Sequence, residues 1–259
     1  MQVCLLCGGT GTRLRDASEL TPKALVPIGG IPMIIHIMRI YSHFGHNKFI
    51  LALGYKQEAF KHYFYNYEII NNDIELEIGR PILEYHIHGT NGRGWVVTLV
   101  DTGENTLKGG RLKRIEKYIT GDTFMCTYGD AVANIDINAL LTFHRSHGRI
   151  ATLTGINPIS KFGEMKHDHG RVIEYSEKPQ DDGCLTNGGF FVFNRKIFNY
   201  LAEDGDLEIG PLEEFAKEGE LFVYHHQGFW KSLDTPKDLG ELQNIWNSGN
   251  VPWKLWSNK

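Results

Sequence analysis

A glycine-rich segment close to the start of the chain combines residue types and a spacing that suit phosphate binding. It reads Gly8-Gly9-Thr10-Gly11-Thr12-Arg13 and follows the apolar run Val3-Cys4-Leu5-Leu6, which has the length of a buried strand. Glycines permit a tight turn, and successive backbone N–H groups in such a turn suit phosphate oxygens. Arg13 adds a planar, permanently charged donor fork that matches phosphate geometry. A strand, a glycine turn and a cation in this order predict a nucleotide-phosphate site.

A lysine farther along the chain strengthens this prediction, because the glycine segment by itself is also typical of an ordinary turn. The segment lacks the Lys-Ser/Thr of a Walker loop and the third glycine of a dinucleotide-binding fingerprint. Lys23 lies in Thr21-Pro22-Lys23-Ala24, where Pro22 restricts Thr21 to an extended conformation. We expect this restriction to aim Lys23 in a fixed direction.

Asp130 and Asp234 are candidate chemical groups, and each also has a structural alternative. Asp130 follows a predicted strand at residues 124–128 and precedes an expected small-residue turn at residues 131–133. Asp234 comes shortly before Pro236, where a helix is expected to begin. Because aspartate often caps a turn or a helix, the residues alone leave both interpretations open.

The hydrophobic pattern predicts strands that alternate with helices. Strands are expected at residues 3–6, 49–53, 74–78, 95–100, 124–128, 151–156, 172–176, 190–193 and 221–225. Helices are expected at residues 31–41, 57–67, 110–118, 137–147, 196–202, 211–219 and 238–247. This alternation predicts an α/β fold with a Rossmann-like, mixed but mostly parallel central sheet covered by helices on both faces. Ligands bind at the carboxyl ends of such strands, which brings the glycine turn and Asp130 to one edge.

The composition limits the classes of protein that fit. With 259 residues, 41% hydrophobic and 22% charged, the chain is long enough for one large α/β domain or two small ones. A net charge of −4 argues against a nucleic-acid or anionic-membrane surface. The sequence shows neither a signal peptide nor an apolar run near the roughly 20 residues of a membrane span. A soluble, cytoplasmic protein is therefore expected.

Cys4 and Cys7 form a Cys-x-x-Cys pair on the first predicted strand. On an extended strand, residues three apart face opposite sides. We therefore expect two small buried residues here, with a redox or metal pair as the less favoured alternative.

The order of several motifs is similar to that of a known protein family. The glycine segment, the Pro22-Lys23 pair and Gly29-Gly30 resemble the sugar-phosphate nucleotidyltransferases, or nucleotide-sugar pyrophosphorylases. Residues 97–103, 109–114, 128–130, 177–179, 187–192, 228–230 and 252–254 narrow the resemblance to the branch that transfers a cytidylyl group. The resemblance covers nearly the whole chain. It implies the nucleotide-diphospho-sugar transferase fold in a single domain, with residues 1–135 mainly nucleotide-binding and residues 136–259 mainly for sugar binding and assembly.

The resemblance implies that a sugar 1-phosphate oxygen attacks the α-phosphorus of CTP and that pyrophosphate leaves. The expected acceptor is α-D-glucose 1-phosphate, in the synthesis of CDP-deoxysugars for surface polysaccharide. Two alternatives stay open: the same reaction with another sugar 1-phosphate or with UTP, dTTP or GTP, and a non-catalytic homologue that binds nucleotide sugars. Residues 84–94 and 164–169 depart from the family pattern, so the identity of the acceptor sugar stays open.

The resemblance also implies roles for individual residues. Asp130 and Asp234 match positions that hold a divalent metal, and Mg²⁺ suits two carboxylates because it keeps several waters. Arg13 would hold the β- and γ-phosphates and Lys23 would reach the α-phosphate; with Asp130 they form the expected catalytic set. The expected nucleotide-binding residues are Leu6, Gly8, Gly9, Thr10, Gly11, Thr12, Arg13, Lys23, Thr102, Gly110, Arg111 and Gly129. The expected sugar-phosphate-binding residues are Glu177, Lys178, Asn187, Gly188 and Gly189.

Base recognition and assembly complete the expectations. Arg111 could donate to the cytosine carbonyl or ring nitrogen, and its alternative is a solvated cation on a basic helix. The resemblance favours a homo-oligomer, with a hexamer as one form, and neither a nucleic-acid nor a membrane partner is expected. Trp246, Trp253 and Trp256 are expected either to cover the core or to join subunits.

Overall fold

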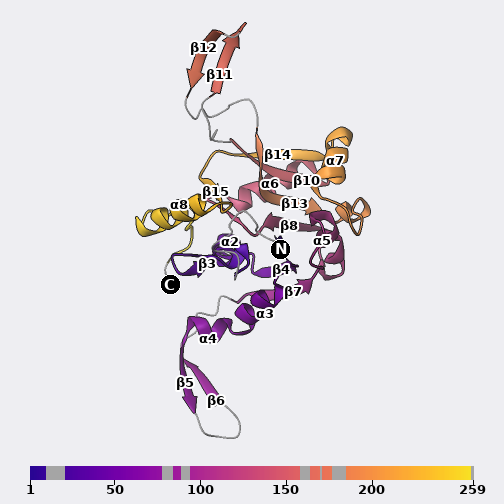
Figure 1. Cartoon of the computed structure of the whole chain (residues 1–259). Helices are drawn as coiled ribbons and strands as arrows, with labels where there is room; N and C mark the ends of the chain where they lie inside the picture. Colours follow the sequence, from indigo (N-terminus) through magenta and orange to yellow (C-terminus); the bar gives the residue numbers. More distant parts are fainter. Residues whose placement is uncertain are drawn as a thin grey trace.

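A seven-stranded mixed sheet forms the centre of the computed structural model, which describes residues 1–9, 21–77, 84–88, 94–157, 164–169, 171–176 and 185–257. Its strand order is β14-β10-β13-β8-β1-β4-β7 (Figure 1). The strands are β1 (Gln2–Cys7), β4 (Lys48–Leu53), β7 (Val96–Asp101), β8 (Thr123–Tyr128), β10 (Ala151–Ile156), β13 (Thr186–Asn194) and β14 (Leu221–His226). Only β13 runs antiparallel to its neighbours β8 and β10, whereas the other pairs are parallel. The predicted mixed, mostly parallel sheet is confirmed.

Helices cover both faces of this sheet, as the sequence predicts (Figure 1). One face packs against α2 (Met33–His43), α6 (Ile137–His147) and α8 (Pro236–Asn247). The other packs against α5 (Lys108–Arg114), α7 (Glu213–Glu218) and the 3₁₀ turn η4 (Arg195–Asn199). The remaining helical segments are α3 (Gln57–Tyr65), α4 (Tyr67–Asn71), η2 (Lys23–Leu25), η3 (Glu116–Tyr118) and η5 (Glu208–Leu212). No helix in the described ranges is long and apolar enough to span a membrane.

Strand β1 is buried on both faces, which explains its uninterrupted apolar sequence. Cys7 belongs to the core on the α2 side, whereas Cys4 belongs to the core on the α5 side. The two thiols therefore face opposite sides of the sheet, as predicted, and both are free and buried.

Two hairpins extend from opposite ends of the body in Figure 1. One consists of β5 (Asp73–Glu77) and β6 (Glu84–His88), the other of β11 (Glu164–Asp168) and β12 (Arg171–Ser176). Strands β6 and β11 were not among the expected elements. Both belong to the segments that we expect to depart from the family pattern.

Several expected boundaries are wrong, and the differences have local causes. The helix expected from Ile31 begins at Met33, because β3 (Ile31–Pro32) pairs with β2 (Pro27–Ile28) in a small hairpin. The turn expected at residues 131–133 is the strand β9 (Ala131–Ala133), which pairs with β15 (Trp230–Ser232). The helix expected at residues 196–202 is the 3₁₀ turn η4, and the helix expected from Pro211 is divided between η5 and α7.

The C-terminal tryptophans cover the core next to α2. Trp253 is fully buried, and the ring of Trp246 lies edge-on to the ring of His36, with 5.0 Å between centroids. Trp253 Nε1 lies 3.3 Å from His36 Nδ1, and His36 Nε2 lies 2.9 Å from the Ile28 carbonyl oxygen. Burial lowers the pKa of His36 to about 4. The imidazole is therefore neutral at pH 7, accepting from Trp253 and donating to Ile28.

Candidate active site

The candidate site lies at the carboxyl ends of β1 and β8, which are adjacent parallel strands. Leu6 pairs with Tyr128, and the Gly129 amide donates to the Leu6 carbonyl oxygen at 3.2 Å. Gly8 therefore leaves the sheet beside Asp130. The predicted meeting of the glycine turn and Asp130 at one sheet edge is confirmed by this pairing.

A cavity of about 540 Å³ opens at this edge, a volume typical of small-molecule sites. Among the predicted site residues, it is lined by Leu6, Gly8, Gly9, Lys23, Arg111, Gly129, Asp130, Asn187 and Asp234. A larger hollow of about 830 Å³ lies between α3, α4 and β7, away from these residues. The convergence of predicted site residues makes the smaller cavity the candidate site.

The Lys23 ammonium lies between the two predicted metal-binding carboxylates. Its Nζ is 2.7 Å from Asp130 Oδ2 and 2.7 Å from Asp234 Oδ1. The Lys23 side chain is 16% exposed, and those of Asp130 and Asp234 are 32% and 35% exposed. Burial lowers the pKa of the Lys23 ammonium, but the two carboxylates outweigh burial and leave this pKa raised above its ordinary value. Lys23 is therefore a fully charged cation at neutral pH.

Two short strands bring these carboxylates together. Ser232 of β15 pairs with Ala131 of β9, and the Leu233 amide donates to the Asp130 carbonyl oxygen at 2.8 Å. Ser232 Oγ then donates to Asp234 Oδ2 at 2.6 Å and orients that carboxylate. The expected alternative, in which Asp234 caps the last helix, does not occur.

Helix α8 is capped by Thr235 instead. The Thr235 hydroxyl accepts from the Asp238 amide, and Asp238 Oδ2 accepts from the Thr235 amide in a reciprocal capping box. This arrangement satisfies the first turn of the helix without Asp234, whose carboxylate faces Lys23.

The two carboxylates fit a hard divalent cation. Their oxygens converge on one positive charge, the Lys23 ammonium, which marks a cation position. No cluster of three or more His, Cys, Asp or Glu ligands occurs in the part of the chain that the structure describes. A pair of carboxylates suits Mg²⁺, which completes its six ligands with waters and substrate phosphates.

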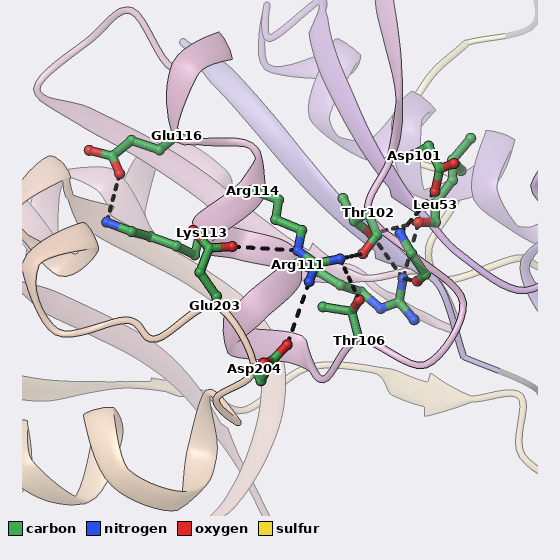
Figure 2. Close-up of polar contacts among 11 residues, drawn as sticks. Leu53, Asp101, Thr102, Thr106, Arg111, Lys113, Arg114, Glu116, Glu203 and Asp204 are labelled. Carbon is green, nitrogen blue, oxygen red and sulfur yellow. Dashed lines mark hydrogen bonds and ion pairs between the residues drawn. The ribbon is translucent and has the colours of Figure 1, made fainter.

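Arg111 is buried rather than solvated, and it joins the ends of three strands. Figure 2 shows it beside Leu53 and Thr102. Its Nη1 donates to the Leu53 carbonyl oxygen, the Thr102 hydroxyl and the Gly103 carbonyl oxygen at 3.0, 2.9 and 2.7 Å. Its Nη2 donates to the carbonyl oxygens of Gly8 and Glu104 at 3.0 and 2.9 Å. Burial lowers the pKa of this guanidinium, which nevertheless stays charged at neutral pH.

These contacts give Arg111 a structural role at the end of the cavity next to Gly8. Leu53 ends β4, Gly8 follows β1, and Thr102 follows β7, so one guanidinium fixes three loops. The terminal nitrogens of Arg111 point to protein oxygens in this structure. Direct donation from Arg111 to cytosine stays a prediction.

Gly8 at the cavity and Gly110 in α5 each make room for a neighbouring group of the protein. A Cβ on Gly8 would lie 2.0 Å from Arg111 Cζ, and a Cβ on Gly110 would lie 2.2 Å from the Glu203 carbonyl oxygen. The Gly110 amide donates to the Gly205 carbonyl oxygen at 2.9 Å. Arg114 adds ion pairs to Glu203 and Asp204 (Figure 2). The tight contact of residues 203–205 with α5 accounts for the glycine at position 110, whose nucleotide contact stays a prediction.

The predicted sugar-side residues lie on β13 and contact Tyr128. Asn187 Oδ1 accepts from the Gly189 amide at 2.9 Å, and Asn187 Nδ2 donates to the Tyr128 hydroxyl oxygen at 3.2 Å. Gly189 has a φ of +82°, and a Cβ there would lie 2.4 Å from the Tyr128 ring. Trp230 Nε1 donates to the Gly188 carbonyl oxygen at 2.8 Å. Strand β13 is thus held rigidly against the end of β8.

Six predicted site residues lie outside the described residues: Thr10, Gly11, Thr12, Arg13, Glu177 and Lys178. Of the remaining predictions, Lys23, Asp130 and Asp234 form one cluster, while Thr102 and Arg111 form a second. Gly129 and Asn187 line the cavity, whereas Thr102, Gly110, Gly188 and Gly189 are not among its lining residues.

Comparison with known proteins decides the family. The nucleotidyl transferase family model matches residues 2–250 of this chain. The chain belongs to the nucleotidyl transferase family. A Bacillus subtilis protein provisionally named glucose-1-phosphate cytidylyltransferase is 43% identical over 258 residues, which cover 99% of this chain and 100% of the relative. Glucose-1-phosphate cytidylyltransferase from Salmonella typhi is 42% identical over the same shares of both chains.

A solved structure shows the same fold. A protein from Bacillus anthracis, provisionally named glucose-1-phosphate thymidylyltransferase, superposes with a TM-score of 0.70 over 100% of this nucleotidyltransferase and 98% of that chain. The two sequences are 18% identical, so the likeness concerns the fold alone.

The sequence did not single out several side chains that line the cavity of this nucleotidyltransferase. Lys108 and Tyr128 both bond to the Glu208 carboxylate, and Lys108 Nζ lies 5.3 Å from the Tyr128 ring centre. Tyr128 stands in the segment 128–130, which carries the family resemblance, so its position offered a signal. The sequence around Glu208 offered no such signal, because Glu208 reaches Lys108 and Tyr128 only through the folding of a loop far along the chain.

The arrangement suits the joining of two anions. Nucleotidyl transfer needs no covalent intermediate; the protein must align a phosphate nucleophile with a triphosphate and offset their repulsion. Within the described residues, Lys23, Lys108 and Arg111 supply positive charge at the cavity. Asp130 and Asp234 supply the oxygens for a cation.

Proposed function

We propose that this nucleotidyltransferase transfers the cytidylyl group of CTP to α-D-glucose 1-phosphate and releases pyrophosphate. The observation that carries the choice of substrates is 42–43% identity over almost the full length to proteins named glucose-1-phosphate cytidylyltransferase. The Lys23, Asp130 and Asp234 cluster supports the chemistry.

In the proposed reaction a phosphate oxygen of the sugar attacks the α-phosphorus of CTP. The bond from that phosphorus to the oxygen that bridges it to the β-phosphorus breaks, and the electron pair leaves with pyrophosphate. Lys23 donates to the α-phosphate, where charge develops, and Arg13 holds the β- and γ-phosphates. Asp130 and Asp234 would hold Mg²⁺, which supplies charge neutralisation and alignment of the phosphates.

The acceptor is proposed to lie against β13. Asn187, Gly188 and Gly189 would shape the sugar pocket, while Lys178 would pair with the acceptor phosphate and Glu177 would accept from sugar hydroxyls. Thr102 and the loops fixed by Arg111 would face the cytosine. Location in the cytoplasm and assembly into a homo-oligomer stay predictions, which fractionation and light scattering test.

A substrate panel tests the proposal. Purified protein with Mg²⁺ and glucose 1-phosphate is assayed for pyrophosphate release with CTP, UTP, dTTP, GTP and ATP in parallel. Strong release with CTP alone is expected. Preference for another nucleotide would overturn the base assignment. If no nucleotide gives release, the same panel is repeated with other sugar 1-phosphates, and failure there would favour a non-catalytic nucleotide-sugar-binding protein.

A matched pair of variants tests the role of Asp130. Asp130→Asn is expected to reduce kcat by a factor of about 10² or more, because a cation ligand at the reacting phosphates is lost. Asp122→Asn is the control, since exposed Asp122 precedes the other end of β8. Equal kcat values in the two variants would contradict the assigned role of Asp130.

A further inference from the structure

Lys23 occupies the point toward which the Asp130 and Asp234 carboxylates converge, and this is the position that a metal bound to both would take. We propose that Lys23 couples metal binding to nucleotide binding: its ammonium neutralises the two carboxylates in the free enzyme and moves to the α-phosphate when the metal and the nucleotide enter. The inference rests on the proposed function, because it requires a triphosphate in this cavity.

The metal and the ammonium compete for the same two carboxylates. Lys23 Nζ lies 2.7 Å from one oxygen of each carboxylate. A Mg²⁺ ion in the place of the ammonium would lie about 2.0–2.1 Å from each of these oxygens. A metal that takes this place therefore displaces the ammonium.

Among the described residues that line the cavity, Asp206 is the one acidic side chain besides these two carboxylates. Its Oδ1 already accepts from the amides of Glu208 and Ile209. A metal that enters alone thus costs Lys23 both of its ion pairs. A metal that enters with a triphosphate brings a new anionic partner for Lys23.

The backbone at Lys23 is held in place, so the movement belongs to the side chain. Lys23 begins the 3₁₀ turn η2, in which Ala24 and Leu25 are buried, and Pro22 precedes it with a φ of −53°. A long, flexible side chain on a fixed backbone can exchange partners within one cavity. By thermodynamic linkage, nucleotide and metal then each raise the affinity for the other by the same factor.

The test measures metal binding without turnover. Mn²⁺ binding to the full-length protein is followed by the electron paramagnetic resonance signal of the free ion, with and without CTP and without any sugar phosphate. Wild-type protein is expected to bind Mn²⁺ weakly alone and at least about tenfold more tightly with CTP. Lys23→Met and Lys23→Gln are each expected to bind Mn²⁺ alone about tenfold more tightly than wild type and to lose most of the CTP effect.

Lys231 provides a matched control. It also bridges two carboxylates, with Nζ 3.4 Å from Asp238 Oδ1 and 2.5 Å from Glu241 Oε2, and it is 20% exposed. Lys231→Met is expected to bind Mn²⁺ with wild-type affinity. An equal gain in Lys231→Met and Lys23→Met would show a general effect of removed charge and would overturn the proposal.

The outcomes separate this inference from the proposed function. If neither Lys23 variant gains Mn²⁺ affinity, the coupling role is wrong, while CTP-dependent pyrophosphate release by wild-type protein would still support the proposed reaction. If the Lys23 variants gain Mn²⁺ affinity but wild-type protein turns over no nucleotide, Lys23 holds the cation position and the proposed reaction is wrong.

Discussion

At the scale of single residues, the loops after β1, β4 and β7 depend on one buried cation. Arg111 is 4% exposed and donates mainly to carbonyl oxygens, so its charge is held by backbone dipoles rather than by a carboxylate. These bonds fix Gly8, which lines the cavity, and Thr102, which is fully buried. The guanidinium is thus a positioning group even if it never contacts the base.

Arg111→Lys is expected to lower the free energy of unfolding by about 2–3 kcal/mol, because several buried carbonyl oxygens lose their donors. The same change is expected to raise KM for CTP, since the loops after β1 and β7 lose their common support. Urea denaturation and steady-state kinetics measure the two effects. Arg149→Lys is the control, because Arg149 is half exposed, pairs with Glu220 away from this cavity, and should cost about 1 kcal/mol or less when changed.

At the scale of elements, short pairings position the site as much as the central sheet does. The β9–β15 pair brings Asp234 to Asp130, and the β2–β3 hairpin follows directly after the turn that carries Lys23. Gly29 and Gly30 have φ values of +59° and +76°, which suit a two-residue hairpin turn. This hairpin packs against Trp246 of α8 and so links the lysine segment to the C-terminal helix.

Two neighbouring glycine variants separate backbone strain from packing at this hairpin. Gly30→Ala is expected to cost about 1–2 kcal/mol, because only the positive φ opposes it and a Cβ there meets open space. Gly29→Ala is expected to cost at least about 1 kcal/mol more, because its Cβ would lie 2.0 Å from Trp246 Nε1. Equal urea midpoints for the two variants would show that Trp246 gives way.

At the scale of the whole molecule, the C-terminal segment is tied to the first half of the chain through a neutral histidine. His36 of α2 receives a hydrogen bond from Trp253 and bonds to the Ile28 carbonyl oxygen. Burial lowers its pKa to about 4. Between that value and the ordinary pKa of about 6.5, the unfolded chain binds more protons than the native protein does.

The free energy of unfolding is therefore expected to fall as the pH is lowered from about 6.5 toward 4. The difference between the two pKa values of His36 corresponds to a loss on the order of 3 kcal/mol, and none of it is lost above pH 6.5. His36→Gln should be less stable at pH 7.5 but should lose less stability on acidification. Urea denaturation across this pH range measures the slopes, with the exposed His43→Gln as control. Parallel slopes for wild type and His36→Gln would contradict this account.

The sequence by itself determined the central architecture and the neighbourhood of the chemistry. Apolar runs such as residues 3–6 predicted the parallel strands, because burial on both faces requires uninterrupted hydrophobic residues. The carboxyl-end rule then placed Asp130 beside the glycine turn. The tertiary structure alone decided that Lys23 lies between Asp130 and Asp234, which are 107 and 211 residues away along the chain.

Arg111 and Glu208 show the same limit for single side chains. Local patterns report backbone preference and periodic burial, so the basic segment around Arg111 was compatible with a solvated helix. Its burial depends on β1, β4 and β7 ending at one point, and the position of Glu208 depends on how a loop far along the chain packs on α5. Such partners are set by long-range packing, which neighbouring residues in the sequence do not encode.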